Sequence, residues 1–302
     1  MSATDFYRYA GGNTANVAIG LARLGVAVKL IAKVGSDFHG QYLKDILAAE
    51  GVDLSCLVED ARYPTAQCYM TIDHDGSPVY RNWPKPHAAD MLGPEDIDKT
   101  VFDSAGFVHS TGISLVTSPR RQAVMHGVEL CKSKDIVLSF DACFPSGLGG
   151  QAHDSALVVM KQVQILKMNL DELRFWSQMP TGTDIDLMVG QVNELAARLA
   201  QEVTLGADGG LLYTGAGKIQ CAPHKVATVC DVGAGDAFMA GMIYALVRKL
   251  PDQGRLEALA RLSAPDWAGI AKAGAVCGAL CTLSVGATET FPRLPELEAL
   301  LT

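Results

Sequence analysis

Apolar and polar residues follow two spacings that alternate along the chain. Val17, Leu21 and Leu24 recur at helical spacing, and Gly25 is placed to end that helix. The next apolar run, 28–34, is short enough for a strand, and a second helical segment follows it. Helix, strand and helix joined by short links indicate a parallel sheet that is covered by helices.

The same rhythm extends over most of the remaining chain. Further helices are predicted over 38–50, 118–134 and 186–201, and strands over 106–111, 136–140, 163–168, 202–205 and 211–213. A last strand is predicted over 226–229, before a long apolar segment without proline that is typical of a buried helix.

One segment, at about 65–84, departs from this pattern. Two short strands, 66–72 and 79–83, flank a run of turn residues and predict a β-hairpin. A hairpin inserted into an α/β chain covers little core, so we expect it to project as a small lid. Tyr69, Arg81 and Asn82 could reach a substrate from there, and we take Arg81 as the candidate contact. Each of the three is more often an exposed lid residue.

The most informative stretch is Gly233-Ala234-Gly235-Asp236, between the last predicted strand and the buried helix. Two glycines at such a turn let the backbone approach a ligand, and the free N–H groups of a helix N-terminus favour an anion. An anion would repel a carboxylate there, so Asp236 is expected to have a task such as accepting a proton. This indicates phosphoryl transfer, with an N–H cradle for the phosphate and Asp236 as the base. The alternative, a glycine-rich helix start capped by Asp236, has equal weight on these residues alone.

A second glycine pair, Gly11 and Gly12, precedes the first predicted helix. It allows close backbone approach, and Asn13 and Asn16 offer amide donors and acceptors for hydroxyl groups. The alternative is that Asn13 is a plain N-cap of the helix.

Polar residues also follow predicted strands, where ligands bind open α/β sheets. They are Asp141, Asn169 and Glu172. After strand 202–205, the glycine-rich run 206–210 is either a nucleotide-holding turn or a hairpin turn.

Composition narrows the choice of partner. Of 302 residues, 49% are apolar and 19% charged, so the chain can bury a sizeable core. The net charge of −8 and the lack of a basic run argue against nucleic acid or a membrane surface as partner. The N-terminus does not resemble a signal peptide. The eight cysteines are scattered, so we expect reduced thiols in a cytoplasmic protein.

Several enzyme classes are disfavoured because their motifs are absent from the sequence. It contains no GxxxxGK[ST], no GxGxxG after a strand, no HExxH and no GxSxG, and its seven histidines lack metal-ligand spacing. A P-loop NTPase, a nicotinamide dehydrogenase, a zincin and an α/β-hydrolase are therefore disfavoured.

The two glycine motifs and the residues between them resemble the PfkB/ribokinase family of carbohydrate kinases, and in particular its fructokinase-like branch. Matching motifs stand in family order along nearly the whole chain: Gly11-Gly12-x₃-Asn16-x-Ala18, Arg23-Leu24-Gly25, Lys33 to Asp37 with Gly40, Asn169-x₂-Glu172, Thr204 to Gly209, Gly233 to Asp236, and Ser284 to Ala287 with Phe291-Pro292. Two glycine motifs more than two hundred residues apart, with NxxE between them, are a specific combination.

The resemblance implies a ribokinase-like three-layer α/β/α sandwich over 1–302, with a mostly parallel sheet and the hairpin as a small β lid. It implies transfer of the γ-phosphate of ATP to a hydroxyl of a ketose such as fructose, or of a 2-keto-3-deoxy sugar acid. The implied cofactors are ATP and Mg²⁺, with K⁺ as a candidate monovalent cation. The family also suggests a homodimer through paired lids.

Roles of individual residues follow from the same resemblance. Asp236 is the expected base, and the N–H groups of Gly233, Ala234 and Gly235 are the expected anion hole. The sugar is expected at Gly11, Gly12 and Asn16. The nucleotide is expected at Asn169, Glu172, Thr204, Gly206 and Gly209, with Glu172 organising Mg²⁺ through water.

The chain departs from the family pattern in several places. The strand that precedes the first glycine pair in the family, with an Asp that grips two sugar hydroxyls, is expected to be absent together with part of the lid. Cys230-Asp231 shifts the usual acid by one position, which puts the K⁺ site in question. The Asn and Arg of the usual DPNxR motif are missing after Asp141, and Ala273 and Ala275 stand where related kinases often have Asn.

Two other functions fit the same residues. A nucleoside or aminoimidazole riboside kinase of this family is the nearest alternative. A non-catalytic sugar- or nucleotide-binding relic is the other, but a binder would need neither a base nor a metal organiser.

Overall fold

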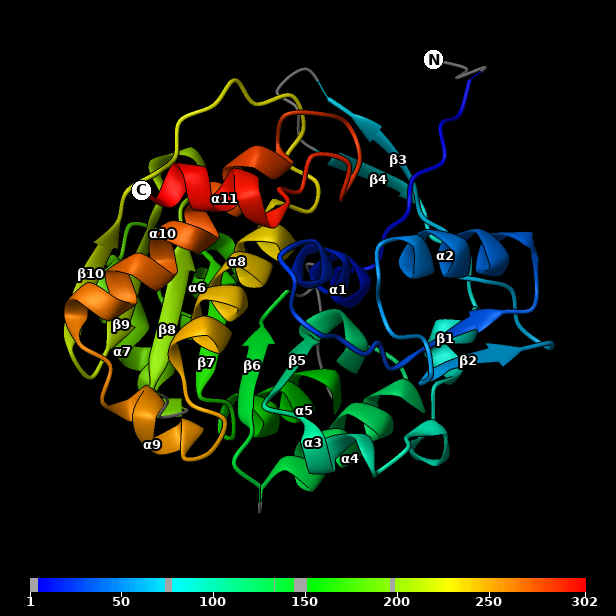
Figure 1. The fold of residues 1–302 in the computed structure, drawn as a ribbon, viewed down its shortest axis with the longest axis horizontal. Helices are drawn as coiled ribbons and strands as arrows, with labels where there is room; N and C mark the ends of the chain where they lie inside the picture. The colour runs from blue at the N-terminus through cyan, green and yellow to red at the C-terminus, as the bar shows by residue number, and fades with distance from the viewer. Residues whose placement is uncertain (1–4, 74–77, 133, 144–150, 196–198) are drawn as a thin grey trace.

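The computed structural model describes residues 5–73, 78–132, 134–143, 151–195 and 199–302. At its centre lies a six-stranded sheet in the order β10-β9-β8-β7-β6-β5 (Figure 1). The strands are β5 (Phe107–Thr111), β6 (Val137–Asp141), β7 (Ile165–Asn169), β8 (Ala200–Thr204), β9 (Gly210–Thr214) and β10 (Gly217–Cys221). β5 to β8 are parallel, whereas β9 and β10 extend the sheet in antiparallel fashion. The sequence predicted the parallel strands but missed β10.

Helices cover both faces of this sheet. One layer contains α8 (Ala234–Lys249), α9 (Arg255–Ala260) and α10 (Ala264–Cys281), and the other contains α4 (Arg120–Cys131), α5 (Gln151–Met160), α6 (Leu170–Ser177) and α7 (Ile185–Leu195). Ile165 of β7 packs into the cluster under α8, and its neighbour Leu166 packs into the cluster under α5. The strand β6, which lies between β7 and β5, is buried along its whole length, as expected for a parallel strand between two helical layers. The predicted three-layer α/β/α sandwich is confirmed.

The first helix, α1 (Asn13–Arg23), packs against α8. A Cβ at Gly20 would lie 2.6 Å from the Cβ of Ala240, so glycine allows the two helices to approach closely. The last helix, α11 (Leu294–Leu301), adds Leu297 to the same hydrophobic cluster. This packing brings the first and the last helix of the chain into one cluster with α8.

The strands β1 (Ala32–Gly35) and β2 (Leu57–Asp60) form a separate parallel pair, connected by α2 (Phe38–Ala49). Within the described residues no strand links this pair to β5, so the sheet is in two parts. The short helix α3 (Val101–Ser104) precedes β5.

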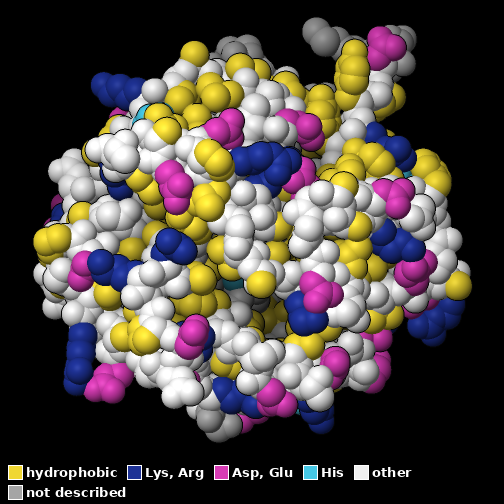
Figure 2. All heavy atoms as spheres, viewed as in Figure 1, with side chains coloured by type: hydrophobic (Ala, Val, Ile, Leu, Met, Phe, Trp, Pro, Cys, Tyr) yellow, Lys and Arg dark blue, Asp and Glu magenta, His cyan; other side chains and the backbone are white. Residues whose placement is uncertain are grey.

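The predicted lid is present as an antiparallel hairpin of β3 (Tyr69–Ile72) and β4 (Pro78–Asn82). The residues of its turn, 74–77, lie outside the described ranges. Tyr69, Met70 and Tyr80 are exposed on it, and the ring of Phe6 meets Tyr69 edge to face. Figure 2 shows hydrophobic side chains beside the N-terminal segment, which rises at the upper right of this view.

One predicted element is absent from the structure, and two others have different bounds. No strand forms over 226–229, because the amides of Val229 and Cys230 donate to Thr282 O at the end of α10 instead of to a strand. The helix predicted over 186–201 is observed as α7 (Ile185–Leu195), and the last two residues of the predicted range, Ala200 and Gln201, belong to the buried strand β8. The strand predicted over 28–34 shortens to β1, with one bridge between Lys29 and Asp53 before it.

Among the described residues, no helix is both long and apolar enough to span a lipid bilayer.

Candidate active site

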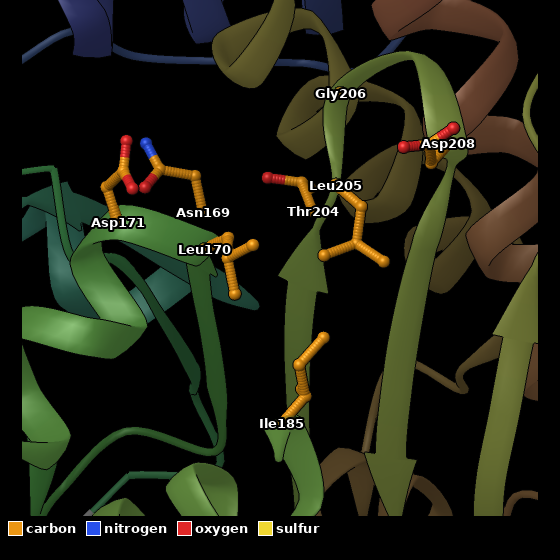
Figure 3. Close-up of a pocket in the computed structure, with 8 residues that line it drawn as sticks. All are labelled: Asn169, Leu170, Asp171, Ile185, Thr204, Leu205, Gly206 and Asp208. Carbon is orange, nitrogen blue, oxygen red and sulfur yellow. The ribbon is translucent and has the colours of Figure 1, made fainter. Parts of the chain in front are cut away.

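A pocket of about 480 Å³ opens where β7 and β8 end (Figure 3). It is lined by Asn169, Leu170, Asp171, Ile185, Thr204, Leu205, Gly206 and Asp208. The structure thus brings together three of the predicted nucleotide-site residues, Asn169, Thr204 and Gly206. Asn169 and Thr204 lie close together because they are register partners at the ends of two adjacent parallel strands.

Gly209 does not line this pocket but forms part of the turn beside it. Its φ is +86°, and a Cβ there would lie 2.1 Å from Cys221 O. The glycine-rich run is therefore both a hairpin turn between β8 and β9 and one wall of the pocket.

Asn169 and Glu172 form a capping box at the start of α6. Asn169 Oδ1 accepts from the Glu172 amide at 2.8 Å, and Glu172 Oε2 accepts from the Asn169 amide at 2.6 Å. Burial raises the pKa of Glu172 above its ordinary value, although the charge of Lys167 opposes the shift. The NxxE motif therefore has a structural task at the start of α6, and its role in organising Mg²⁺ stays a prediction.

The turn before α8 exposes backbone amides at the helix N-terminus. Gly233 is the N-cap with a φ of 82°, and a Cβ there would lie 2.3 Å from Ala287 O. Among the described residues, no acceptor bonds the amides of Gly233, Gly235 or Asp236. The amide of Ala234 differs, because it donates to Asp231 O at 3.1 Å. The role of Ala234 in an anion hole stays a prediction that requires this bond to open.

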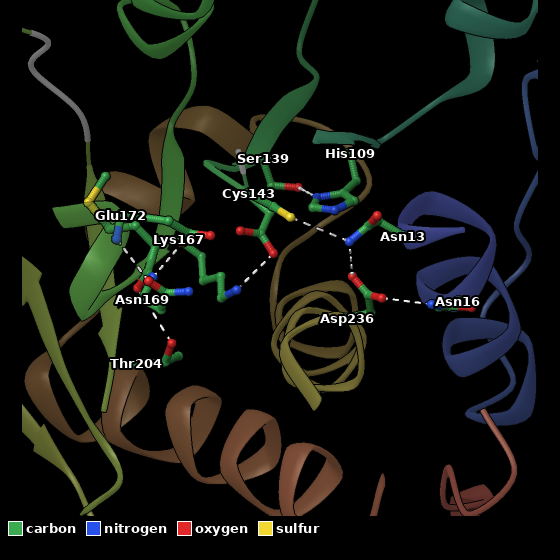
Figure 4. A network of polar contacts seen from close by, with 12 residues as sticks. Asn13, Asn16, His109, Ser139, Cys143, Lys167, Asn169, Glu172, Thr204 and Asp236 are labelled. Atoms are coloured by element: carbon green, nitrogen blue, oxygen red, sulfur yellow. Dashed lines mark hydrogen bonds and ion pairs between the residues drawn. The ribbon is translucent and has the colours of Figure 1, made fainter. Parts of the chain in front are cut away.

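Asp236 lies in the first turn of α8 and is 5% exposed. Asn16 Nδ2 donates to its Oδ2 at 2.7 Å and Asn13 Nδ2 to its Oδ1 at 3.2 Å (Figure 4). Burial raises the pKa of Asp236 to about 7; the bond from Asn16 opposes the shift, and the charge of Asp141 adds to it. A carboxyl group with this pKa can exchange a proton near neutral pH.

The first glycine pair leads into α1. Gly12, with a φ of +108°, is the N-cap, and a Cβ at Gly11 would meet no atom within 4 Å. Asn13 is the first helical residue, and its side chain bonds Asp236 and, at 3.7 Å, Cys143 Sγ. The alternative that Asn13 is a plain N-cap is wrong. The structure therefore adds Asn13 to the residues around the predicted base.

Lys167 is a site residue that sequence reasoning missed. Its Nζ donates to Asp141 Oδ2 at 2.8 Å, and both side chains are buried. The only signal in the sequence was a lysine inside an otherwise apolar strand.

Arg81, the predicted lid contact, bonds Thr71 across the hairpin at 3.0 Å. Among the described residues it bonds none of the predicted site residues, so its substrate contact stays a prediction.

The residues near the turn differ from those expected for the K⁺ site. Position 230 carries a buried cysteine, and Cys281 Sγ lies 3.3 Å from Val232 O and 3.6 Å from Ala287 O, so its single proton is shared between these two acceptors. These carbonyl oxygens are thus bonded by a thiol, whereas hard cations require several free oxygen ligands.

Comparisons with known proteins find relatives over almost the whole chain. Residues 1–294 match the model of a family described as pfkB family carbohydrate kinase. A fructokinase of Klebsiella pneumoniae is 31% identical over 295 residues, which cover 95% of this chain and 90% of the relative. A fructokinase structure from Vibrio cholerae O395 in fructose, ADP and calcium ion bound form is 25% identical, with a TM-score of 0.84 over 99% of this chain and 93% of that one. A fructokinase structure from Xylella fastidiosa with bound ATP is 25% identical, with a TM-score of 0.87, and the match covers 98% of this chain and 91% of that one.

Proposed function

Because the chain belongs to the pfkB family of carbohydrate kinases, we propose that it transfers the γ-phosphate of ATP to a hydroxyl of a ketose such as fructose. A 2-keto-3-deoxy sugar acid is the second substrate class within this proposal. One observation carries it: Asp236 is a buried carboxylate, held by two amides, in the same turn as the unbonded backbone amides of Gly233 and Gly235. Transfer of a phosphoryl group to an alcohol requires such a base beside such a cradle.

In this reaction the sugar hydroxyl approaches Asp236 Oδ1 and replaces the bond from Asn13. The pKa of an alcohol lies far above that of a carboxylic acid, so Asp236 takes the proton late, as the new oxygen–phosphorus bond forms. ADP leaves with the electron pair of the broken bond. The amides of Gly233 and Gly235 and the dipole of α8 stabilise the charge on the moving phosphoryl group.

The sugar is assigned to the space in front of Gly11, Gly12 and Asn16. Glycine at these two positions leaves the backbone open to a ligand, and a Cβ at Gly11 would fill part of that space. Arg81 is the proposed contact from the lid.

The nucleotide is assigned to the pocket of Asn169, Thr204 and Gly206, with Gly209 holding its turn. Bound Mg²⁺ would neutralise phosphate charge, and Glu172 would hold it through water. The donors fit this role, because the carboxylates of Glu172, in the first turn of α6, and Asp141, at the end of β6, are oxygen ligands, and no described residue bonds Asp141 Oδ1. No group of three or more His, Cys, Asp or Glu side chains in the described ranges forms a metal cage, which also suits an ion held largely by water and phosphate.

The test is a substrate panel with the wild-type protein, ATP and Mg²⁺, in which ADP release is coupled to a colour reaction and products are weighed by mass spectrometry. We expect phosphorylated fructose, or a phosphorylated sugar acid. Turnover restricted to nucleosides or aminoimidazole riboside would replace the ketose by the alternative substrate class. Sugar binding by calorimetry without any turnover would favour the binding relic.

Two broader expectations also remain proposals. A homodimer through the lids is supported by the exposed Tyr69, Met70 and Tyr80, and analytical ultracentrifugation tests it. A cytoplasmic location is supported by the eight cysteines, all of which are free thiols.

A further inference from the structure

Three ionisable side chains form one row across the central sheet. Asp141, Lys167 and Glu202 are register partners on the adjacent strands β6, β7 and β8, so they point to the same face. All three are at most 5% exposed. On the same face of the sheet, Ile165 and Ala200, two positions before Lys167 and Glu202, and Val137, four positions before Asp141, belong to the hydrophobic cluster under α8. The row therefore lies in the core beneath the helix that carries the proposed base.

Lys167 reaches from this row to the phosphate cradle. A Cβ built on Gly235 would lie 2.7 Å from Lys167 Nζ and 3.9 Å from Asp141 Oδ2, so the ammonium group sits directly against the turn. In Figure 4 Lys167 lies between Asn169 and Glu172 on one side and Asp236 on the other. The ammonium group thus stands between the two halves of the proposed active site.

The ammonium group also has unused donors. Among the described residues its one hydrogen-bond acceptor is Asp141 Oδ2, whereas an ammonium group carries three protons. Burial lowers the pKa of Lys167, but the charges of Asp141 and Glu172 outweigh burial and raise it, so the group is charged.

Stability alone does not account for this arrangement. A buried ion pair is often no more stable than apolar residues of the same size, because both charges lose their hydration. A positive charge at the N-terminus of α8 is also unfavourable, because the helix dipole is positive there. An incoming anion would remove both disadvantages.

We propose that Lys167 is a further catalytic residue, which binds the γ-phosphate of ATP from beneath the Gly233–Asp236 turn. Asp141 holds the ammonium group in place while the cradle is empty. When the phosphate arrives, Lys167 directs its unused protons to the phosphate oxygens, and its charge joins the backbone amides in stabilising the transferred group. The proposal rests on the kinase function proposed above.

The experiment separates this role from a purely structural one. Lys167→Met alone would leave Asp141 buried and unpaired, so the key variant is the double substitution Asp141→Asn with Lys167→Met. Its thermal midpoint is compared with the wild type, and ATP and ADP are titrated by calorimetry in the absence of sugar, both in EDTA and with Mg²⁺. We expect a folded protein whose ADP affinity is little changed and whose ATP affinity falls about 10- to 100-fold, the usual effect of losing a charge-assisted hydrogen bond. The value of kcat should fall at least as far.

Asp141→Asn alone is the matched control, since it keeps Lys167 and removes only its present partner. Its ATP affinity in EDTA should be equal to or higher than that of the wild type. The proposal is overturned if the folded double variant recovers wild-type kcat, if ATP and ADP affinities fall equally, or if Asp141→Asn loses ATP affinity in EDTA. If the double variant does not fold, the ATP affinity of Asp141→Asn in EDTA tests the proposal by itself. Because nucleotide binding is measured without sugar, the result is independent of the panel that tests the kinase function.

Discussion

Asn16 Nδ2 lies 2.7 Å from Asp236 Oδ2, and this bond joins two side chains that are 220 residues apart in the sequence. Asn13, one turn earlier on the same face of α1, holds the other carboxylate oxygen. The orientation of the proposed base therefore depends on how α1 packs against α8, where Gly20 permits close contact. This relationship connects the two glycine motifs that stood out in the sequence.

The first prediction concerns the base itself. Asp236→Asn keeps the size of the side chain but removes its ability to take a proton, so kcat should fall by about 100- to 10,000-fold. Nucleotide affinity should stay near the wild-type value, because Asp236 does not line the nucleotide pocket. ADP release and calorimetry measure the two quantities. Asp252→Asn, at an exposed position after α8, is the control and should be fully active; an active Asp236→Asn variant would exclude this mechanism.

The predictability of the site differs from residue to residue. Motifs of fixed spacing mark Asp236, Asn16, Asn169 and Thr204, so the sequence predicts that Asn16 approaches Asp236 and that Asn169 approaches Thr204, as the structure shows, while their roles stay predictions. Asn13 stays ambiguous in the sequence, which does not tell whether its side chain turns to its own helix or to α8. Lys167 could not be assigned at all, because only the parallel register of β6, β7 and β8 places it beneath Gly235.

The secondary-structure elements also differ in how well the sequence predicts them. Strands flanked by long amphipathic helices were predicted correctly, because two periodicities alternate there. The strand predicted over 226–229 did not form, since its amides bond the end of α10, which is distant in sequence. The apolar pattern predicts helix at the start of β8, because a short apolar run fits both structures until its partners are known.

The second prediction is a pH dependence. Only ionised Asp236 can accept the proton, and its pKa is raised to about 7, so kcat/KM should fall about tenfold per pH unit as the pH drops below neutrality. Asn13→Ala removes a hydrogen bond that lowers this pKa, and the acid limb of the profile should therefore move to higher pH. Asn13→Ser, which can still donate, should move it less. A profile that is flat down to pH 5 would show that another group is the base.

The third prediction separates the two tasks of Glu172. Glu172→Gln keeps an oxygen that can accept from the Asn169 amide but removes the negative charge, so the thermal midpoint should hardly change. The Mg²⁺ concentration for half-maximal activity should rise about 10-fold or more, as for other residues that act on a metal through water. Glu296→Gln is the matched control, because Glu296 makes the same capping bond to the Arg293 amide in α11. Equal Mg²⁺ dependence in all three proteins would contradict a role in metal binding.

The fourth prediction is that K⁺ does not activate the protein. The Cys281 thiol bonds the carbonyls of Val232 and Ala287, and Cys230 offers no carboxylate. Activity in KCl should therefore equal activity in tetramethylammonium chloride at the same ionic strength. Dialysed protein assayed in both salts provides the measurement. A saturable activation by K⁺ would show that the thiol moves aside for the cation.

The fifth prediction uses two glycines with opposite surroundings. Gly233→Ala introduces a Cβ at positive φ and 2.3 Å from Ala287 O, so the loop after α10 or the turn itself must move. Strain from the dihedral angle alone costs about 1–2 kcal/mol of stability, and the displaced amides should lower kcat as well. Gly190→Ala, in the middle of α7 with no atom within 4 Å of the new Cβ, should instead stabilise the protein by about 0.5–1 kcal/mol and leave kcat unchanged. Thermal unfolding and steady-state rates of both variants check this. If Gly233→Ala kept wild-type stability and rate, the amides of this turn would not form the phosphate cradle, because they could not have stayed in place beside the new methyl group.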